Sequence, residues 1–456
     1  MLIIFFISSL ITLDSPLNSR IDYLQSRGLI NTKTIKPFEL LETIQEIDTL
    51  FFQEQKLNKI DRDMISSFGP LFAKSNEFYT ILNISGGRNK TNCFYTNLDL
   101  QFSGRITDNI SLHNGVRFHF SSDIDYTGPK PWKDIVQAYM NEGYIKFKNK
   151  KSGLTIGRRN LLLGFGDEHS LLLSPAKEGY DGFIFTYKGK YYLFHTTFSV
   201  LDPRKMRFIS THRIGLDLNN IQLGFSESIL WGGEIEPLYL NFLLPYYLSQ
   251  WGMDRNDNIM WLFDGSINFF NTILYGEFLI DDYQFSEPPA GYTEYPNKLG
   301  FQCGIKKIIF EKIFLKVNYT FVDKWVYTHE LQKNIYENDS LCLGFPLGND
   351  VDQWLLILRF LHKKIFPQIR FEYTRKGIGS LYIPYEVERG PAYPEFPSGG
   401  QRVEKRICVL PGIEFCFHPR LYLNIEGGRE YIYNFEHIPH ENKDKNIINL
   451  WFWLLF

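Results

Sequence analysis

Apolar and polar residues alternate in short segments over most of the chain, from residue 77 to residue 456. In residues 313–321, for example, apolar side chains alternate with Phe314, Lys316, Asn318 and Thr320. Because successive side chains of a β-strand point to opposite faces, each segment is predicted to form a strand with one apolar and one more polar face. This pattern predicts roughly eighteen strands.

The connections between these segments are alternately short and long. Short turns are predicted at residues 104–107, 149–153, 188–190, 217–220, 270–272, 310–312, 362–367 and 417–420. Longer connections are predicted at residues 87–92, 122–138, 164–179, 202–206, 232–258, 282–298, 324–350, 376–401 and 436–445. A transmembrane β-barrel keeps its short turns on one side of the membrane and its long loops on the other, whereas a soluble sandwich has no such constraint.

The last strand also favours a membrane barrel. Its apolar face is unbroken and consists of Ile448, Leu450, Phe452, Leu454 and Phe456. A terminal aromatic residue resembles the assembly signal of outer-membrane barrels, which makes the barrel-assembly machinery an expected partner. A soluble protein would leave such a strand as an aggregation-prone edge, whereas a closed barrel pairs it with the first strand.

The predicted fold class is therefore all-β, a transmembrane antiparallel β-barrel of about 18 strands formed by residues 77–456. We expect a monomer in the bacterial outer membrane, surrounded by lipid, with the long loops extracellular. Aromatic residues make up 16% of the chain, as girdles at two membrane interfaces would require. The net charge of −2 gives no indication of nucleic acid as a partner.

The first residues differ from the barrel. Residues 1–14 are mostly apolar and are predicted to be a signal peptide, although no Lys or Arg precedes the apolar run. Residues 15–76 are predicted to be a small periplasmic helical segment. Its first helix should stop at Gly28, a second should begin at Pro37, and a third should contain Ile60, Met64 and Ile65.

No motif in the chain indicates a cofactor, a metal or a catalytic centre. The five cysteines are scattered and form no CxxC pair, so neither zinc nor a disulfide framework is predicted. No GxSxG, HExxH or glycine-rich phosphate loop occurs. We therefore expect no enzyme, although a catalytic pair built from distant strands would leave no such motif.

Several pieces of the sequence resemble the capsule assembly Wzi family. They are residues 20–30 with Lys36-Pro37-Phe38, then residues 166–174, 212–216, 238–246 and 274–282, in the family's order. The chain departs from the family where Gly164-Phe165-Gly166 replaces an expected Trp-Gly-Pro. The resemblance implies an eighteen-stranded outer-membrane barrel with a periplasmic helical bundle. It also implies a lectin-like role, in which the protein holds capsular or exported polysaccharide at the cell surface.

The long loops carry aromatic residues beside hydrogen-bonding groups, the combination that binds sugars. The candidate polysaccharide-binding residues are Tyr126, Trp132, Tyr239, Tyr246, Tyr247, Trp251, Tyr382, Tyr385, Arg389 and Tyr393. Any one of them could instead belong to the interface belt or to a loop core. Rim and lumen candidates are Glu277, Asp281, Asp282, Arg117, Arg359 and Arg370. The three acidic residues could bind a sugar or a cation, but they are expected to pair with the arginines and fill the barrel.

Three functions stay open from the sequence, and polysaccharide binding at the cell surface is favoured among them. The second is an outer-membrane porin or substrate channel, since a wide barrel can be water-filled. The third is an outer-membrane enzyme or an assembly factor. Large residues on the predicted lumen face, such as Tyr95, Phe314, Leu355 and Ile357, favour a filled barrel over an open channel.

Overall fold

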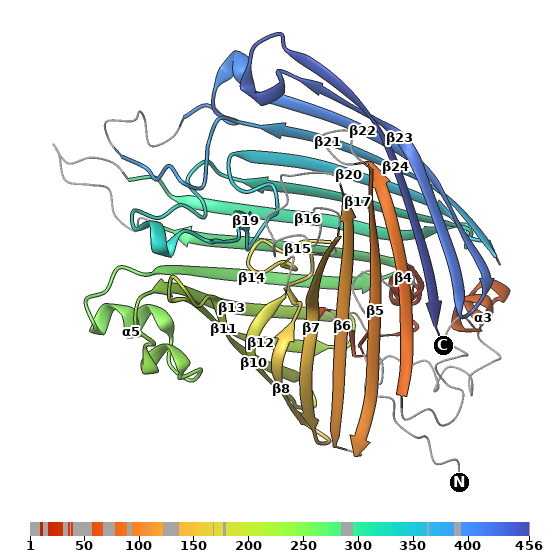
Figure 1. Ribbon diagram of the computed structural model, residues 1–456, viewed down its shortest axis with the longest axis horizontal. Coiled ribbons are helices and arrows are strands. Elements are labelled where there is room, and N and C mark those ends of the chain that lie inside the picture. The colour runs from red at the N-terminus through yellow and green to blue at the C-terminus, as the bar shows by residue number, and fades with distance from the viewer. Residues whose placement is uncertain are drawn as a thin grey trace.

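The structure is a computed structural model that describes residues 10–11, 17–30, 35–36, 38–39, 57–66, 78–88, 94–107, 109–121, 136–166, 168–176, 179–283, 295–362, 364–386 and 394–455. Within these ranges the chain forms a closed antiparallel barrel of 18 strands, as predicted (Figure 1). None of the helices in the described ranges is long and apolar enough to cross a membrane.

The barrel strands follow one another around the wall in chain order. They are β4 (Phe78–Arg88), β5 (Phe94–Thr107), β6 (Ile110–Ser121), β7 (Val136–Lys148), β8 (Ser152–Arg159), β10 (Tyr180–Lys188), β11 (Tyr192–Asp202), β12 (Arg207–Leu218), β13 (Ile221–Gly232), β14 (Asn258–Phe269), β15 (Thr272–Asp282), β16 (Lys298–Ile309), β17 (Ile313–Val322), β20 (Val351–Phe360), β21 (Ile365–Lys376), β22 (Glu404–His418), β23 (Leu421–Tyr433) and β24 (Asn442–Leu455). The last strand pairs with the first, from Asn449 with Gly87 to Leu455 with Ile81, and closes the barrel as predicted.

Side chains alternate between lumen and exterior as the sequence pattern predicts. Along β17 the inward residues Phe314, Lys316, Asn318 and Thr320 are buried, and the residues between them are not. Exposed apolar side chains cover the outside of the wall and include Leu100, Phe102, Ile145, Ile156, Ile214, Leu216, Leu223 and Phe263. We call this surface the outer apolar band; lipid would contact it.

The connections also alternate as predicted, so the barrel has a short-turn end and a long-loop end. One predicted turn is misplaced, because β5 continues through residues 104–107. There Gly104 pairs with Leu112, and a bulge lies between Arg105 and Thr107.

Two short helices, α1 (Leu17–Ser26) and α3 (Lys59–Ser66), pack together at the short-turn end. Gly28 follows α1 with a positive φ of 68°, as the predicted end of the helix requires. A shared apolar core joins the two helices to inward residues of the barrel. It comprises Leu17, Ile21, Tyr23, Leu24, Ile30, Leu57, Met64, Ile65, Ile308, Phe314, Leu361, Phe366, Cys416, Tyr422 and Trp453. The helices therefore occupy the lumen at this end.

Ion pairs fix α1 to the wall. The buried guanidinium of Arg20 pairs with Glu414 and lies 4.6 Å from the ring centroid of Phe366. The Nζ atom of Lys306 lies 2.7 Å from Asp22 Oδ1. A buried charge that keeps its partner is tolerated, whereas one that loses it is costly.

The start predicted for the second helix, at Pro37, is wrong. Phe38–Glu39 is instead an extended strand, β3, that pairs with β1 (Leu10–Ile11). Just before it, β2 (Ile35–Lys36) pairs with β9 (Leu162–Leu163), a strand of the connection between β8 and β10. Pairing with other segments therefore holds residues 35–36 and 38–39 in extended conformation. Residues 40–56 lie outside the described residues.

Only Leu10–Ile11 is described from residues 1–14, so the signal peptide stays a prediction. The same holds for the domain boundaries at residues 15–76 and 77–456.

Replacing Arg20 by Met should release α1 from the barrel, because Glu414 would stay buried without its partner. Breaking such a pair costs about 3–5 kcal/mol. We expect faster hydrogen exchange of the α1 amides in the folded protein, measured by mass spectrometry. The double variant R20M/E414L removes both charges and should recover much of the protection. Unchanged exchange in R20M would contradict this role of the pair.

Candidate functional site

The connection between β8 and β10 folds into the lumen. We call its described residues, 160–166 and 168–176, the inward loop. Its leucines, among them Leu161, Leu171 and Leu172, are fully buried. Inside the barrel, Glu277 of β15 accepts hydrogen bonds from the amides of Gly166 (2.6 Å) and Leu171 (2.8 Å). The inward loop thus supplies hydrogen-bond donors to a carboxylate that is buried in the lumen.

Glycine is required where the inward loop approaches Glu277. A Cβ atom on Gly164 would lie 2.2 Å from Glu277 Oε1, and one on Gly166 would lie 1.9 Å from the carbonyl oxygen of His169. The backbone of Gly164 also has a φ of 126°, which residues with a side chain rarely adopt. The Gly-Phe-Gly sequence, which departs from the family pattern, is therefore matched to this close approach.

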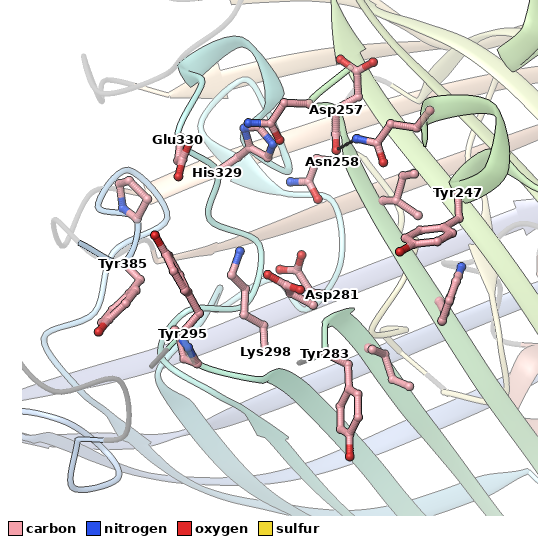
Figure 2. A pocket seen from close by; sticks show the side chains of 18 residues that line it. Tyr247, Asp257, Asn258, Asp281, Tyr283, Tyr295, Lys298, His329, Glu330 and Tyr385 are labelled. Atoms are coloured by element: carbon pink, nitrogen blue, oxygen red, sulfur yellow. Dashed lines mark hydrogen bonds between the residues drawn. The ribbon is translucent and has the colours of Figure 1, made fainter. Parts of the chain in front are cut away.

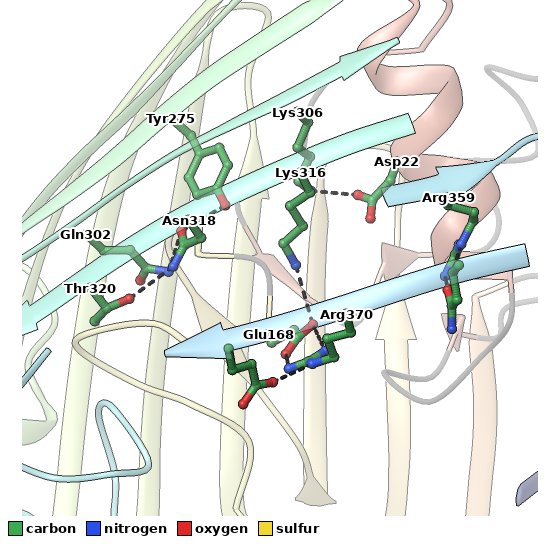
Figure 3. Close-up of polar contacts among 12 residues, drawn as sticks. Asp22, Glu168, Tyr275, Gln302, Lys306, Lys316, Asn318, Thr320, Arg359 and Arg370 are labelled. Carbon is green, nitrogen blue, oxygen red and sulfur yellow. Dashed lines mark hydrogen bonds and ion pairs between the residues drawn. The ribbon is translucent and has the colours of Figure 1, made fainter. Parts of the chain in front are cut away.

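A second carboxylate, Glu168 on the inward loop itself, binds the opposite wall. Arg370 Nη1 and Nη2 donate to its two oxygens at 2.7 and 2.6 Å, and Lys316 Nζ lies 3.4 Å away (Figure 3). Burial would raise the pKa of Glu168, but the positive charges of Lys316 and Arg370 hold it well below its ordinary range. The inward loop is thus held by three strands of the wall, β15, β17 and β21.

The loop between β17 and β20 caps the inward loop. The hydroxyl groups of Tyr327 and Tyr336 donate to the carbonyl oxygens of Leu171 (2.6 Å) and Leu172 (2.9 Å). Burial raises the pKa of both phenols, so they remain donors at neutral pH. The cavity that lies beside Glu168 measures about 10 Å³, which is room for about one water molecule. Among the described residues, the lumen beside Glu168 is therefore closely packed.

Arg117, Arg359 and Arg370, the arginines named as partners for Glu277, bind other residues. Arg117 pairs with Asp99 (2.5 Å), Arg359 donates to Gln368 (2.6 Å), and Arg370 binds Glu168. Glu277 takes loop amides as its partners instead. The reason is that the inward loop carries donors into the lumen, which the strand pattern does not reveal.

A cavity of about 340 Å³ opens at the rim of the long-loop end, beside the first residues of β14 and β16 and the end of β15. We call it the rim cavity (Figure 2). Its lining combines aromatic rings with carboxylates, amides, a lysine and a histidine. The lining residues are Tyr247, Gln250, Asn256, Asp257, Asn258, Ile259, Trp261, Ile280, Asp281, Asp282, Tyr283, Tyr295, Pro296, Lys298, His329, Glu330, Pro384 and Tyr385.

Aromatic groups stand on two sides of the rim cavity, with charged groups between them. On one side the ring of Tyr385 lies 5.9 Å from that of Tyr295, and on the other the ring of Tyr247 lies 5.6 Å from that of Trp261. Lys298 and Asp281 lie between the two pairs (Figure 2). The amide of Tyr327 also donates to Asp281, at 2.6 Å, so this carboxylate is tied to the cap of the inward loop.

Two further polar residues are positioned by the surrounding loops. Asp257 accepts hydrogen bonds from Tyr239 Oη (2.8 Å) and Arg255 Nε (2.9 Å), which fixes the carboxylate in place. Burial and the nearby charge of Lys298 lower the pKa of His329 to about 4, so its ring is neutral at pH 7. Among the described residues no three His, Cys, Asp or Glu side chains lie together as a metal site requires.

The structure brings four of the predicted candidates to the rim cavity, namely Tyr247, Tyr385, Asp281 and Asp282. Two others, Tyr239 and Tyr246, are buried in a loop core, and two more, Trp251 and Tyr382, are exposed away from the cavity. The remaining loop candidates lie outside the described residues; they are Tyr126, Trp132, Arg389 and Tyr393. That any of these residues binds polysaccharide stays a prediction.

Four lining residues are not among the candidates predicted from the sequence, namely Trp261, Tyr295, Lys298 and His329. Tyr295 and His329 lie in the predicted long loops 282–298 and 324–350, so a search of every long loop for rings would have found them. Trp261 and Lys298 lie on strands, and their place at the rim depends on where those strands begin.

No protein-family model and no curated protein matches the sequence. Among solved structures, the chain is similar to Wzi, an outer-membrane protein involved in group 1 capsule assembly in Escherichia coli and a carbohydrate-binding β-barrel. The match covers 98% of this chain and 99% of Wzi, with a TM-score of 0.67 and 15% identity. The predicted resemblance is thus confirmed for the fold, which is that of an outer-membrane β-barrel.

Two further solved structures align over less of the chain. A variant of OccD1 (OprD) matches with a TM-score of 0.49 and 9% identity, over 83% of this chain and 94% of its own. Pseudomonas aeruginosa OprD matches over the same shares, with a TM-score of 0.46 and 8% identity.

Replacing Glu168 by Gln should loosen the inward loop at neutral pH. Bonds between charged groups contribute about 1.5–3 kcal/mol each, so we expect amide exchange at Leu171 to rise about 10- to 100-fold. Because the pKa of Glu168 is lowered in the folded protein, its contribution is complete above its ordinary pKa and is lost as the pH falls below about 4.5. Wild type should lose protection in that acidic window, and E168Q should show no such step.

Glu372→Gln is the matched control, since this carboxylate binds the same arginine from the same strand. It should leave the inward loop protected. Equal exchange in wild type, E372Q and E168Q would show that Glu168 does not hold the loop.

Proposed function

We propose that this protein binds a capsular or exported polysaccharide at its long-loop end and holds it at the cell surface. The observation that carries the proposal is the rim cavity, which combines aromatic rings and charged groups in one space at the long-loop end. In this proposal the long loops are extracellular, and the N-terminal helical segment is periplasmic.

The chemistry of the rim cavity suits a sugar. The apolar faces of sugar rings pack against aromatic side chains, which Tyr247 and Tyr385 offer from opposite sides. Sugar hydroxyl groups both donate and accept, and Asp281 and Lys298 offer both kinds of partner within the same space. A volume of about 340 Å³ lies at the lower end of the range for ligand pockets. It would accommodate a short stretch of a polymer whose remainder stays outside.

The shared fold supports the same reading, since Wzi is a carbohydrate-binding β-barrel involved in capsule assembly. The segments that fold into the lumen speak against the alternative of a porin or substrate channel. A channel needs a continuous aqueous path, and both α1 at the short-turn end and the inward loop stand in its way. The role of the barrel-assembly machinery and the monomeric state remain predictions.

Tyr247→Ala and Tyr385→Ala should each weaken polysaccharide binding about tenfold, which corresponds to about 1.4 kcal/mol. Each variant removes one aromatic face of the rim cavity while leaving the charged groups in place. The measurement is calorimetric titration of the full-length protein in detergent with purified surface polysaccharide from the source cell.

Tyr382→Ala is the matched control, because this exposed tyrosine lies in the same loop as Tyr385 but not at the rim cavity. Its affinity should equal that of wild type. If all three variants bind as wild type does, the rim cavity is not the binding site.

A further inference from the structure

Part of the barrel's outer wall is covered by the chain itself. Arg207 of β12 points into the lumen, where it binds Glu337 at 2.6 Å, so its neighbour Phe208 points outward. Yet Phe208 is buried, while Ile214 and Leu216, farther along the same face, are 54% and 45% exposed. The buried outward residues pack against the connection between β13 and β14. We call this connection, residues 233–257, the external flap; it contains η2 (Pro237–Leu240) and α5 (Tyr246–Gly252).

A buried carboxylate fixes the external flap to the wall. Glu227 pairs in register with His212, whose Nε2 atom lies 3.1 Å away on the same outward face. The amides of Tyr246 and Tyr247 donate to Glu227 at 2.7 and 3.1 Å, and Trp261 Nε1 donates at 2.9 Å. An unpaired carboxylate on the lipid face of a barrel is unfavourable. His212 and Trp261 of the wall supply two of the partners of Glu227, and the flap amides of Tyr246 and Tyr247 supply the other two, so the flap completes the pairing of this carboxylate.

The other side of the external flap is apolar and exposed. Leu243, Leu248 and Trp251 are 77%, 58% and 75% exposed, and Tyr247 and Leu244 are partly so. No charged residue occurs between Glu236 and Asp254. Soluble surfaces rarely expose a contiguous apolar patch of this kind.

The flap reaches the level of the outer apolar band. The ring of Phe242 lies 6.2 Å from that of Phe185 and 5.4 Å from that of Phe194. Both partners lie within the spans of β10 and β11, away from the loops at their long-loop ends. α5 itself contacts β13 and lies outside the barrel (Figure 1). The exposed apolar side of the flap is thus continuous with the surface that lipid contacts.

We propose that the external flap is a lipid-binding element. Leu243, Leu248 and Trp251 enter the boundary between acyl chains and head groups in the leaflet at the long-loop end. The occupant is the acyl chain of a membrane lipid, as for amphipathic helices that lie in a membrane interface. Trp251 has the amphipathic ring that such an interface favours. Tyr247 belongs to both the flap and the rim cavity, so the cavity would open at the membrane surface.

The test uses the full-length protein refolded into phosphatidylcholine vesicles whose acyl chains carry bromine close to the head groups. Bromine quenches tryptophan fluorescence at short range. We expect Trp251→Phe to remove a strongly quenched component of the emission. Trp354→Phe is the positive control, since Trp354 is exposed on the lipid-facing side of β20, and Trp231→Phe is the negative control, since Trp231 is buried beneath the flap.

The proposal is overturned if Trp251→Phe changes the quenched fraction no more than Trp231→Phe does. That result, combined with chemical cross-links between copies of L248C, would identify a second copy of this chain as the occupant. An equal loss of quenched emission in W251F and W354F supports lipid contact.

Discussion

The carboxylate of Glu277 lies inside the barrel, and the amides of Gly166 and Leu171 satisfy it. A wide barrel must pair the charges that its strands point inward, either with water or with protein. Here the inward loop supplies the protein partners, and Glu168 binds it to Arg370 on the facing wall. Tyr327 and Tyr336 cap the inward loop, and the amide of Tyr327 also binds Asp281 at the rim cavity.

A carboxylate on a strand that binds a segment outside the strands occurs at two further places in the barrel. At the short-turn end, Arg20 of α1 pairs with Glu414. On the outside, the external flap supplies partners to Glu227. In each case the added segment contributes partners to a carboxylate on a strand, although Glu227 also has His212 and Trp261 of the wall as partners. The attachment of these segments in the lumen, at the short-turn end and on the outer wall therefore depends on charged groups whose pairing is complete only in the whole fold.

The barrel itself could be predicted from sequence, because alternation and turn length are local properties of the chain. The partners of inward charges could not, since Glu277 and Gly166 are 111 positions apart. The direction in which each long loop folds could not be predicted from the sequence either. Tyr239 and Tyr246 are residues of the kind that bind sugars, but their loop folds over the outer wall and buries them. The pieces resembling the Wzi family include the inward loop and the strand that carries Glu277. The resemblance therefore marked segments whose contacts the strand pattern did not reveal.

Conductance tests the central claim, that the barrel is closed by its own loops and does not transport solutes. The refolded protein would be inserted into a planar bilayer and recorded at single-channel resolution, before and after surface polysaccharide from the source cell is added. A barrel closed by its own loops should show no steady conductance in either state, and the protein should retain the polymer. Large, stable openings in the absence of polymer would contradict this claim and identify the protein as a channel.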